Sequence, residues 1–336
     1  MTKTYARILG TGSFLPERHL TNADLAKRVN TNNEWIVERT GIRERRLSEN
    51  GTAAMAAEAA QQALADAEIS AEELDLVIAA TSTPDYAFPG VACQVQAAIG
   101  ANRAFCFDLA AACSGFLYAL STAAAYIESG IARKILVIGA DAMSKITNWE
   151  DRGTCILFGD GAGAAVLTAA STGLMAFDLG TSGLDGGSLT CPFGTEPEEL
   201  PYIHMDGRRV FQFAVRTVPE TIRRVLAEAS WEKDEVRYYF LHQANARILA
   251  SVARTLQIPE KKMPMNIAYC GNTSAASIPI LLDEWNRAGR ISPGDKLVLA
   301  GFGAGLTWGA AALEWKRKKT AGKGIVRGIE PEKQNR

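Results

Sequence analysis

The chain repeats part of its own sequence 162 positions later, and this constrains its fold more than any other feature. Residues 64–81, LADAEISAEELDLVIAAT, align without gaps on residues 226–243, LAEASWEKDEVRYYFLHQ. At the same spacing, KILVIGAD from Lys134 falls on KLVLAGFG from Lys296. Matches of several segments at one offset indicate a duplicated half-domain rather than two unrelated domains.

Short segments rich in Val, Ile and Leu alternate with helical patterns in both repeats, which predicts an α/β fold with buried strands. We expect helices over 52–68, 114–129, 209–229 and 246–256, and strands over 74–81, 134–141, 163–169, 236–242 and 296–303. We divide the chain into an N-terminal half (1–170), a C-terminal half (171–315) and a basic C-terminal extension (316–336). The N-terminal segment MTKTYARILGTG reads as a strand that turns at its glycines.

Additional residues interrupt the repeat in the first half. GAAVL at Gly163 matches GAAAL at Gly309, so about 16 extra residues lie around AMSKITNWEDRGTCIL. Insertions on a duplicated scaffold tend to be functional loops. The 162-residue offset also places Cys113 opposite Ala275, inside GNTSAASIPILL. Two facing halves would then bring Cys113, Asn272 and the segment FLHQAN within reach of one another.

The charge balance excludes some classes of function. The formal net charge is −1, so no overall field favours nucleic acid or an anionic membrane.

No apolar run is long enough for a transmembrane helix, and the N-terminus lacks the pattern of a signal peptide. Six cysteines form no CxxC pair, which favours reduced thiols over disulfides or a zinc site. We therefore expect a cytoplasmic protein without a metal.

Cys113 stands in DLAAACSGFLYAL, where small residues lead into an apolar helix. Packing is one explanation, since free cysteine is often buried. The alternative is chemical, because the N-terminus of a helix stabilises a thiolate. The Cys113 N–H, and a backbone N–H near Ala304 in GFGAG, would also suit an oxyanion site.

Two polar residues of the second half are further candidates. His242 leaves the end of the strand VRYYFL, where α/β proteins usually bind ligands, although a satisfied core histidine is the alternative. Asn272 in YCGNTSAAS is typical of a turn or cap, but the repeat places it opposite Cys113. The glycine-rich segments FGDGAGAAV and GFGAGLTWGAAAL lack a nucleotide-binding pattern, and we interpret them as tight turns and close packing.

Six ordered segments between about residues 5 and 315 resemble the β-ketoacyl-[acyl-carrier-protein] synthase III family. They are NNEWIVERTGIRERR, DLAAACSGF, DRGTCILFGDGAGAAV, LHQANARI, GNTSAAS and GFGAGLTWG. The resemblance implies a thiolase-like fold, in which duplicated half-domains form a five-layered αβαβα sandwich. It also implies an acyltransferase that condenses a short acyl-CoA, typically acetyl-CoA, with malonyl-acyl carrier protein to initiate fatty acid synthesis. No metal or redox cofactor is implied.

The resemblance assigns a role to each matching residue. It makes Cys113 the acyl-accepting nucleophile, His242 and Asn272 its catalytic partners, and the Ala304 N–H an oxyanion donor. Trp35 and Arg152 would enclose the adenine of CoA, and the rest of the CoA path would be lined by Thr31, Arg39, Asn245 and Arg247. The acyl carrier protein would meet Gln243, Ala244, Asn245, Ala246 and Arg247. Phe88, in PDYAFPG, would reach into the acyl pocket of a neighbouring subunit.

A homodimer is also expected from the residues themselves. A duplicated α/β half-domain leaves a strand edge open in each half, and pairing two chains closes such an edge. The tip YAFPG carries no charge, which suits burial against a neighbour.

Two positions depart from the family pattern, and three alternatives remain open. Ala304 stands where many members have a glycine, and Ser114 where alanine is common. A papain-like hydrolase also uses Cys, His and Asn in that order, but it has no use for a Trp–Arg pair that binds CoA. A non-catalytic binding module would leave Cys113 merely buried. A related condensing enzyme or acyltransferase of a secondary pathway is not separated, because preference for acyl length depends on pocket volume.

Overall fold

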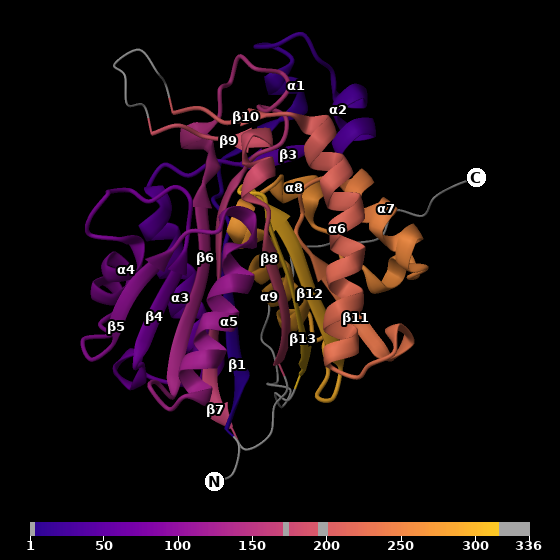
Figure 1. The fold of residues 1–336 in the computed structure, drawn as a ribbon. Coiled ribbons are helices and arrows are strands. Elements are labelled where there is room, and N and C mark those ends of the chain that lie inside the picture. The colour runs from indigo at the N-terminus through magenta and orange to yellow at the C-terminus, as the bar shows by residue number, and fades with distance from the viewer. Residues whose placement is uncertain (1–3, 171–174, 194–200, 316–336) are drawn as a thin grey trace.

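The computed structural model describes residues 4–170, 175–193 and 201–315, whose main strands form two sheets side by side (Figure 1). The first sheet has the order β1-β7-β6-β4-β5, with β1 Tyr5–Phe14, β4 Leu76–Ala80, β5 Phe105–Leu109, β6 Lys134–Ala142 and β7 Asp160–Ala170. The second has the order β11-β12-β13-β8, with β8 Met175–Thr181, β11 Val236–Leu241, β12 Lys296–Gly303 and β13 Thr307–Glu314. Each sheet joins parallel strands to an antiparallel pair.

Helices cover both faces of each sheet and make five layers (Figure 1). The outer face of the first sheet is covered by α3 (Gly51–Ala67) and α4 (Val91–Ile99). Between the sheets lie α5 (Gly115–Glu128) and α9 (Ser277–Arg287), and the outer face of the second sheet is covered by α6 (Gly207–Glu228) and α7 (Ala246–Leu256). The expected αβαβα sandwich and the predicted helices and strands are thereby confirmed.

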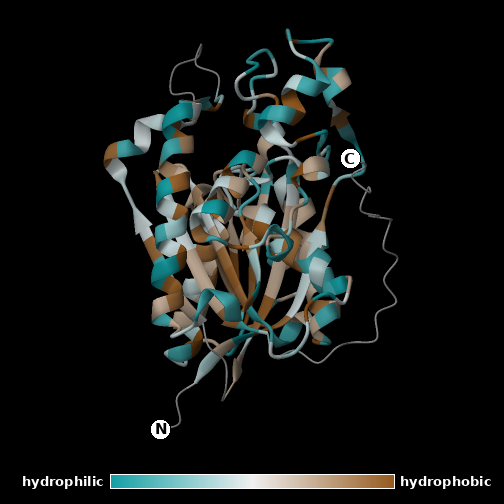
Figure 2. Ribbon diagram, turned by 90° about the vertical axis from the view of Figure 1, so that its right-hand side faces the viewer, coloured by the Kyte–Doolittle hydropathy of each residue, from teal (hydrophilic) through white to brown (hydrophobic). Residues whose placement is uncertain are grey.

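Strand residues alternate between two apolar layers, which explains the continuous apolar runs in the sequence. In β6, Leu136 and Ile138 pack on the outer helices, while Ile135 and Val137 face the central helices. Figure 2 shows hydrophobic residues concentrated on the inner strands and hydrophilic ones on the outer helices and loops. The central helices are therefore buried between two apolar sheet faces.

The sequence repeat recurs in the backbone residue by residue. The 3-10 turn Ala71–Glu73 has its counterpart in Lys233–Glu235. Glu68 and Ser230, also 162 positions apart, both have a φ of 56°. The halves differ at β5, because the equivalent residues of the second half form the short helix α8 (Ile267–Cys270).

The expectation that the N-terminal strand turns at its glycines is wrong. β1 continues through Gly10 and Gly12, and helix α3 lies directly on it. A Cβ on Gly10 would lie 2.4 Å from the Ala67 nitrogen, and one on Gly12 2.3 Å from the Ala59 oxygen. The glycines thus allow close approach of strand and helix rather than a turn. Gly163 in FGDGAGAAV serves the predicted packing role, since its Cβ would lie 2.6 Å from the Ile280 nitrogen of α9.

Short elements cap one end of the sandwich (Figure 1). They are α1 (Asn22–Leu25), α2 (Asn33–Thr40), β2 (His19–Thr21), β3 (Glu44–Arg46), β9 (Leu189–Thr190) and β10 (His204–Met205). The buried Arg45 guanidinium joins this cap to the first-half insertion by donating to the Leu20 and Ile156 carbonyls, each at 2.9 Å. No helix in the described ranges combines the length and apolar character needed to cross a membrane.

Candidate active site

A cavity of about 630 Å³ lies where the two halves and the cap meet. Its wall includes Cys113 from the first half, and His242 and Asn272 from the second. Trp35 and Arg152 of the cap line the same cavity. The structure therefore brings together the predicted catalytic residues and part of the predicted CoA-binding set, although these positions are distant in sequence.

Cys113 lies in a 3-10 turn, Ala112–Ser114, that leads into α5. The thiol is buried, and this burial, reinforced by the Asp141 carboxylate, raises its pKa to about 12. Hydrogen bonds from the Ser274 hydroxyl and the Cys113 N–H act in the opposite direction and lower the pKa. Desolvation thus outweighs the expected stabilisation of a thiolate by the helix N-terminus.

The end of β12 closes the cavity beside Cys113. A Cβ on Gly303 would lie 2.6 Å from the Cys113 nitrogen, so only a glycine fits there without a shift. Gly303 lines the cavity, whereas Ala304, the next residue, is half-buried and is not among the lining residues. The Ser114 hydroxyl is buried 3.2 Å from the Thr307 hydroxyl of β13, so it joins the two halves rather than adding a free group.

His242 follows β11 and is fixed from two directions. Its N–H donates to the Ala300 carbonyl at 2.8 Å, and its ring Nδ1 lies 2.6 Å from the Ser277 Oγ. The side chain is buried, and burial lowers the pKa of the imidazole to about 3. The ring is therefore neutral at neutral pH, and its second nitrogen remains for a ligand.

Asn272 is held by the inserted residues of the first half. Its N–H donates to the Leu157 carbonyl at 2.8 Å, and its carbonyl accepts from the Gly159 N–H at 3.0 Å. Its side-chain Oδ1 accepts from the Ser274 N–H at 2.9 Å. Because Oδ1 is occupied in this way, Asn272 offers its Nδ2 donor to the cavity.

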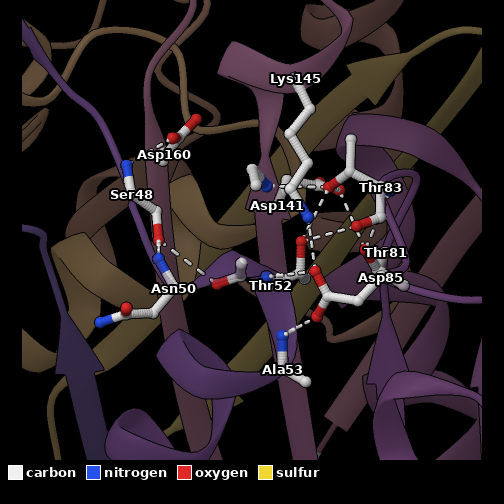
Figure 3. A network of polar contacts seen from close by, with 12 residues as sticks. Ser48, Asn50, Thr52, Ala53, Thr81, Thr83, Asp85, Asp141, Lys145 and Asp160 are labelled. Carbon is white, nitrogen blue, oxygen red and sulfur yellow. Dashed lines mark hydrogen bonds and ion pairs between the residues drawn. The ribbon is translucent and has the colours of Figure 1, made fainter.

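The buried Asp141 carboxylate supports this arrangement, and the sequence analysis did not identify it (Figure 3). It accepts from the Ser82 N–H at 2.7 Å, from the Thr83 hydroxyl at 3.0 Å and from the Ala275 N–H at 3.2 Å. Burial raises its pKa, whereas these donors lower it. Asp141 thus connects the turn after Asn272 to the start of the loop that carries Phe88. The available signal was a single carboxylate within the apolar run KILVIGAD.

Trp35 is covered by two guanidinium groups. The Cζ atoms of Arg39 and Arg152 lie 4.7 and 4.8 Å from its ring centroid. All three residues line the cavity, whereas Thr31 is not among its lining residues. Such spacing leaves no room for another flat group between Arg152 and the indole. An adenine that stacks between them requires Arg152 to swing away, which breaks its 3.0 Å hydrogen bond to the Asn30 carbonyl.

The segment predicted to meet a carrier protein divides into buried and accessible residues. Ala244, Asn245 and Arg247 line the cavity, and Ala246 is half-buried beside them. Gln243 is fully buried, and its amide donates to the Leu241 carbonyl and accepts from the Asn266 N–H. Its side chain is therefore unavailable to a partner, which corrects the surface role expected for it. Five residues of α6 also line the cavity without having been predicted: Gly207, Arg208, Val210, Phe211 and Gln212.

Phe88 lies away from the cavity on an exposed loop. Its side chain is 87% exposed, and that of the nearby Tyr86 is 61% exposed. The base of the loop is anchored, because Asp85 accepts from the Thr52 and Ala53 N–H groups at the start of α3 (Figure 3). The loop therefore projects apolar surface from a fixed base.

This chain is similar to known proteins over most of its length. Residues 107–183 match the family model of 3-oxoacyl-[acyl-carrier-protein (ACP)] synthase III, and residues 226–315 match the model of its C-terminal region. The chain is 48% identical over 324 residues to β-ketoacyl-[acyl-carrier-protein] synthase III of Desulfitobacterium hafniense (strain Y51). This alignment covers 93% of this chain and 98% of the relative.

Two solved structures are similar in fold and sequence. The 3-oxoacyl-[acyl-carrier-protein] synthase III from Aquifex aeolicus VF5 has a TM-score of 0.89 and 46% identity, and the match covers 92% of this chain and all of that chain. The priming β-ketosynthase from the R1128 polyketide biosynthetic pathway has a TM-score of 0.91 and 34% identity, with coverage of 95% and 98%.

Proposed function

The chain belongs to the β-ketoacyl-[acyl-carrier-protein] synthase III family of condensing acyltransferases, and on this basis we propose how its own residues perform the reaction. The substrates are a short acyl-CoA, acetyl-CoA in the first instance, and malonyl-acyl carrier protein. The product is a 3-oxoacyl-acyl carrier protein, the first condensation product of fatty acid synthesis. The observation that carries the assignment is the cavity that Cys113, His242 and Asn272 all line.

In the first step, Cys113 takes the acyl group from CoA. Its sulfur attacks the thioester carbonyl, the bond from that carbonyl to the CoA sulfur breaks, and the thiol proton leaves with CoA as its free thiol. The N–H groups of Cys113 and Ala304 stabilise the oxygen of the tetrahedral intermediate. Ala304 keeps the N–H that a glycine at this position would supply.

In the second step, malonyl-acyl carrier protein loses CO₂ beside the acyl-enzyme. The electron pair of the broken carbon–carbon bond enters an enolate, and the thioester oxygen gains negative charge. A donor from His242 and the Asn272 Nδ2 hold this oxygen. The new carbon nucleophile then attacks the acyl carbonyl, and the bond to the Cys113 sulfur breaks. Its electron pair stays on the sulfur, which takes a proton from water and becomes a thiol again. Since loss of CO₂ generates the nucleophile, the proposed steps need no metal and no redox cofactor.

Several residues that line the cavity suit the binding of CoA and of the carrier protein. Trp35 and Arg152 bind the adenine after Arg152 moves, while Arg39, Asn245 and Arg247 line the path toward Cys113. Thr31 lies next to this set in sequence, and its buried hydroxyl has no partner among the described residues. The accessible segment Ala244–Arg247 is proposed to meet the carrier protein.

We also propose a two-fold homodimer as the active form. β5 is an edge strand of the described first sheet, and Phe105 on it is 45% exposed. Together with Tyr86 and Phe88, it leaves apolar surface that a second copy would cover. In that assembly Phe88 borders the acyl pocket of the partner subunit.

Intact-protein mass spectrometry tests the proposal directly. The protein is mixed with acetyl-CoA, then with longer acyl-CoAs, and finally with malonyl-acyl carrier protein. We expect one added acetyl group that disappears when malonyl-acyl carrier protein is supplied, with formation of acetoacetyl-acyl carrier protein. Release of free acetate without condensation would instead support a hydrolase.

A further inference from the structure

We propose that Ser277 is a positioning residue that holds His242 in the tautomer protonated at Nε2, so that the ring donates a hydrogen bond into the cavity. The inference rests on the proposed role of His242 in stabilising the enolate. It assigns a task to a hydroxyl that the sequence analysis did not identify. It also explains why a buried, neutral histidine acts as a donor rather than as a base.

The geometry places Ser277 directly behind the imidazole. Ser277 is the first residue of α9, and it is buried. Its Oγ lies 2.6 Å from Nδ1 of His242, within hydrogen-bond distance. The same oxygen lies 3.4 Å from the backbone nitrogen of Gln243, whose N–H points toward it.

The direction of the 2.6 Å hydrogen bond follows from counting protons. A backbone N–H always donates, so the Gln243 amide takes one lone pair of the Ser277 oxygen. The hydroxyl has a single proton, and across the described residues Nδ1 of His242 is the only acceptor that Ser277 Oγ contacts. The hydroxyl therefore donates to Nδ1, and Nδ1 carries no proton.

A neutral imidazole that accepts at Nδ1 carries its proton on Nε2. Burial keeps the ring neutral, since it lowers the pKa of His242 to about 3. The Nε2–H then serves as the counterpart of the Asn272 Nδ2 donor. With the opposite tautomer, a lone pair on Nε2 would face the developing enolate oxygen and repel it.

The repeat shows that this hydroxyl belongs to only one half. The position equivalent to Ser277 in the first half is Gly115, at the start of α5. Gly115 packs against Ala80 and Ala275, and no histidine precedes it at the position equivalent to His242. The serine is thus found where a histidine needs orientation, which a general requirement for helix initiation does not explain.

Nitrogen-15 NMR of the histidine-labelled protein tests the tautomer without any substrate. The chain has only three histidines, so His19→Gln and His204→Gln variants assign the His242 signals. We expect wild-type His242 to show a protonated Nε2 and an unprotonated Nδ1. In Ser277→Ala we expect the signals to move toward a mixture of tautomers, and Ser277→Thr, which retains the hydroxyl, to restore the wild-type pattern.

Kinetics of the same variants separate positioning from structural damage. Removal of the donor at Nδ1 should slow malonyl-acyl carrier protein decarboxylation at least about tenfold, while acylation by acetyl-CoA changes little. Thr147→Val, which removes a buried hydroxyl bonded to the Met143 carbonyl at 2.8 Å, is the control for general loss of stability. It should leave both the tautomer and decarboxylation unchanged.

Different results would overturn the positioning role of Ser277 and the proposed enzymatic function. A wild-type His242 protonated at Nδ1 overturns the positioning role, whether or not the protein condenses acyl groups. An unchanged tautomer and an unchanged decarboxylation rate in Ser277→Ala overturn it as well. Failure of the wild-type protein to form an acetyl-enzyme overturns the proposed function instead, and leaves the NMR result interpretable.

Discussion

Ala112 and Ser274, 162 positions apart, hold the same left-handed backbone conformation, with φ of 46° and 51°. Each begins the turn that leads into a central helix, and Ala112 directly precedes Cys113. Residues other than glycine adopt this region rarely, and they keep it only where packing imposes it. Here each half imposes it on the other, since Gly303 packs against Cys113 and Gly139 packs against Ala275. The position of Cys113, the proposed nucleophile, thus depends on contact between the halves.

The first prediction concerns the nucleophile. Cys113→Ala should abolish the stable acetyl-enzyme, because Cys113 is the one cysteine that lines the cavity in the described part of the chain. Cys93, Cys106, Cys155, Cys191 and Cys270 should each be replaceable by alanine without loss of the adduct. Intact mass and peptide mapping after treatment with acetyl-CoA check this. An acetyl group on any other cysteine contradicts the assignment.

The second prediction concerns the pH dependence of the free thiol. Because burial raises the pKa of Cys113 to about 12, only a small fraction is thiolate at neutral pH. That fraction grows as the pH rises, so alkylation of Cys113 by iodoacetamide should accelerate about tenfold per pH unit from pH ~6 to ~9. Quenched time points with mass spectrometry measure the rate. A plateau below about pH 8 indicates a thiolate stabilised by the helix N-terminus.

Residue patterns and the internal repeat are sufficient to predict a duplicated α/β fold, because buried strands and inner helices leave strong apolar periodicity. The five-layered αβαβα arrangement is expected only from the family resemblance. The offset also predicts that Asn272 lies within reach of Cys113, and both residues line the cavity. The residues that hold Cys113, His242 and Asn272 in place could not be predicted from the sequence. Asp141 and Ser277 act through hydrogen bonds between segments far apart in sequence, and a lone Asp or Ser leaves no pattern that distinguishes it from a cap or a turn.

The third prediction separates the roles of the two donors. His242→Ala and Asn272→Ala should each reduce malonyl decarboxylation by about 100-fold or more, since each removes a donor to the enolate oxygen. Acylation by acetyl-CoA should decline much less. Release of CO₂ and the acylation burst, measured on the same preparations, provide the comparison. Loss of acylation with intact decarboxylation would falsify this division and support a hydrolase-like Asn272.

A fourth prediction follows from the low pKa of His242. With a pKa of about 3, the imidazole stays neutral from pH ~8 down to ~5, so its protonation should not reduce the decarboxylation rate across that range. The rate is best measured on Cys113→Ala, which lacks the acylation step. A fall of the rate with a midpoint between pH 6 and 7, absent in His242→Gln, contradicts the buried neutral state.

The proposed CoA-binding group is harder to predict from residue patterns, because its members come from the cap and the insertion. Trp35→Ala and Arg152→Ala should raise the KM for acyl-CoA about tenfold, given a cation–π and stacking contribution of roughly 1–2 kcal/mol. The KM for malonyl-acyl carrier protein should change less. Arg290→Ala is a matched control, because Arg290 covers Trp285 at 4.6 Å and neither residue lines the cavity. Equal losses toward both substrates place these residues outside the CoA path.

The last prediction concerns assembly and acyl selection together. Phe88 is 87% exposed on an anchored loop, so in a monomer its ring would stay in water and contribute nothing to the site of its own chain. In the proposed dimer, Phe88→Ala enlarges the partner's acyl pocket and should raise activity with longer acyl-CoAs relative to acetyl-CoA. Ile131→Ala, which removes a 63% exposed side chain elsewhere, should leave that ratio unchanged. Light scattering during turnover gives the independent check, because a fully active monomer is incompatible with a pocket completed by Phe88 of a second chain.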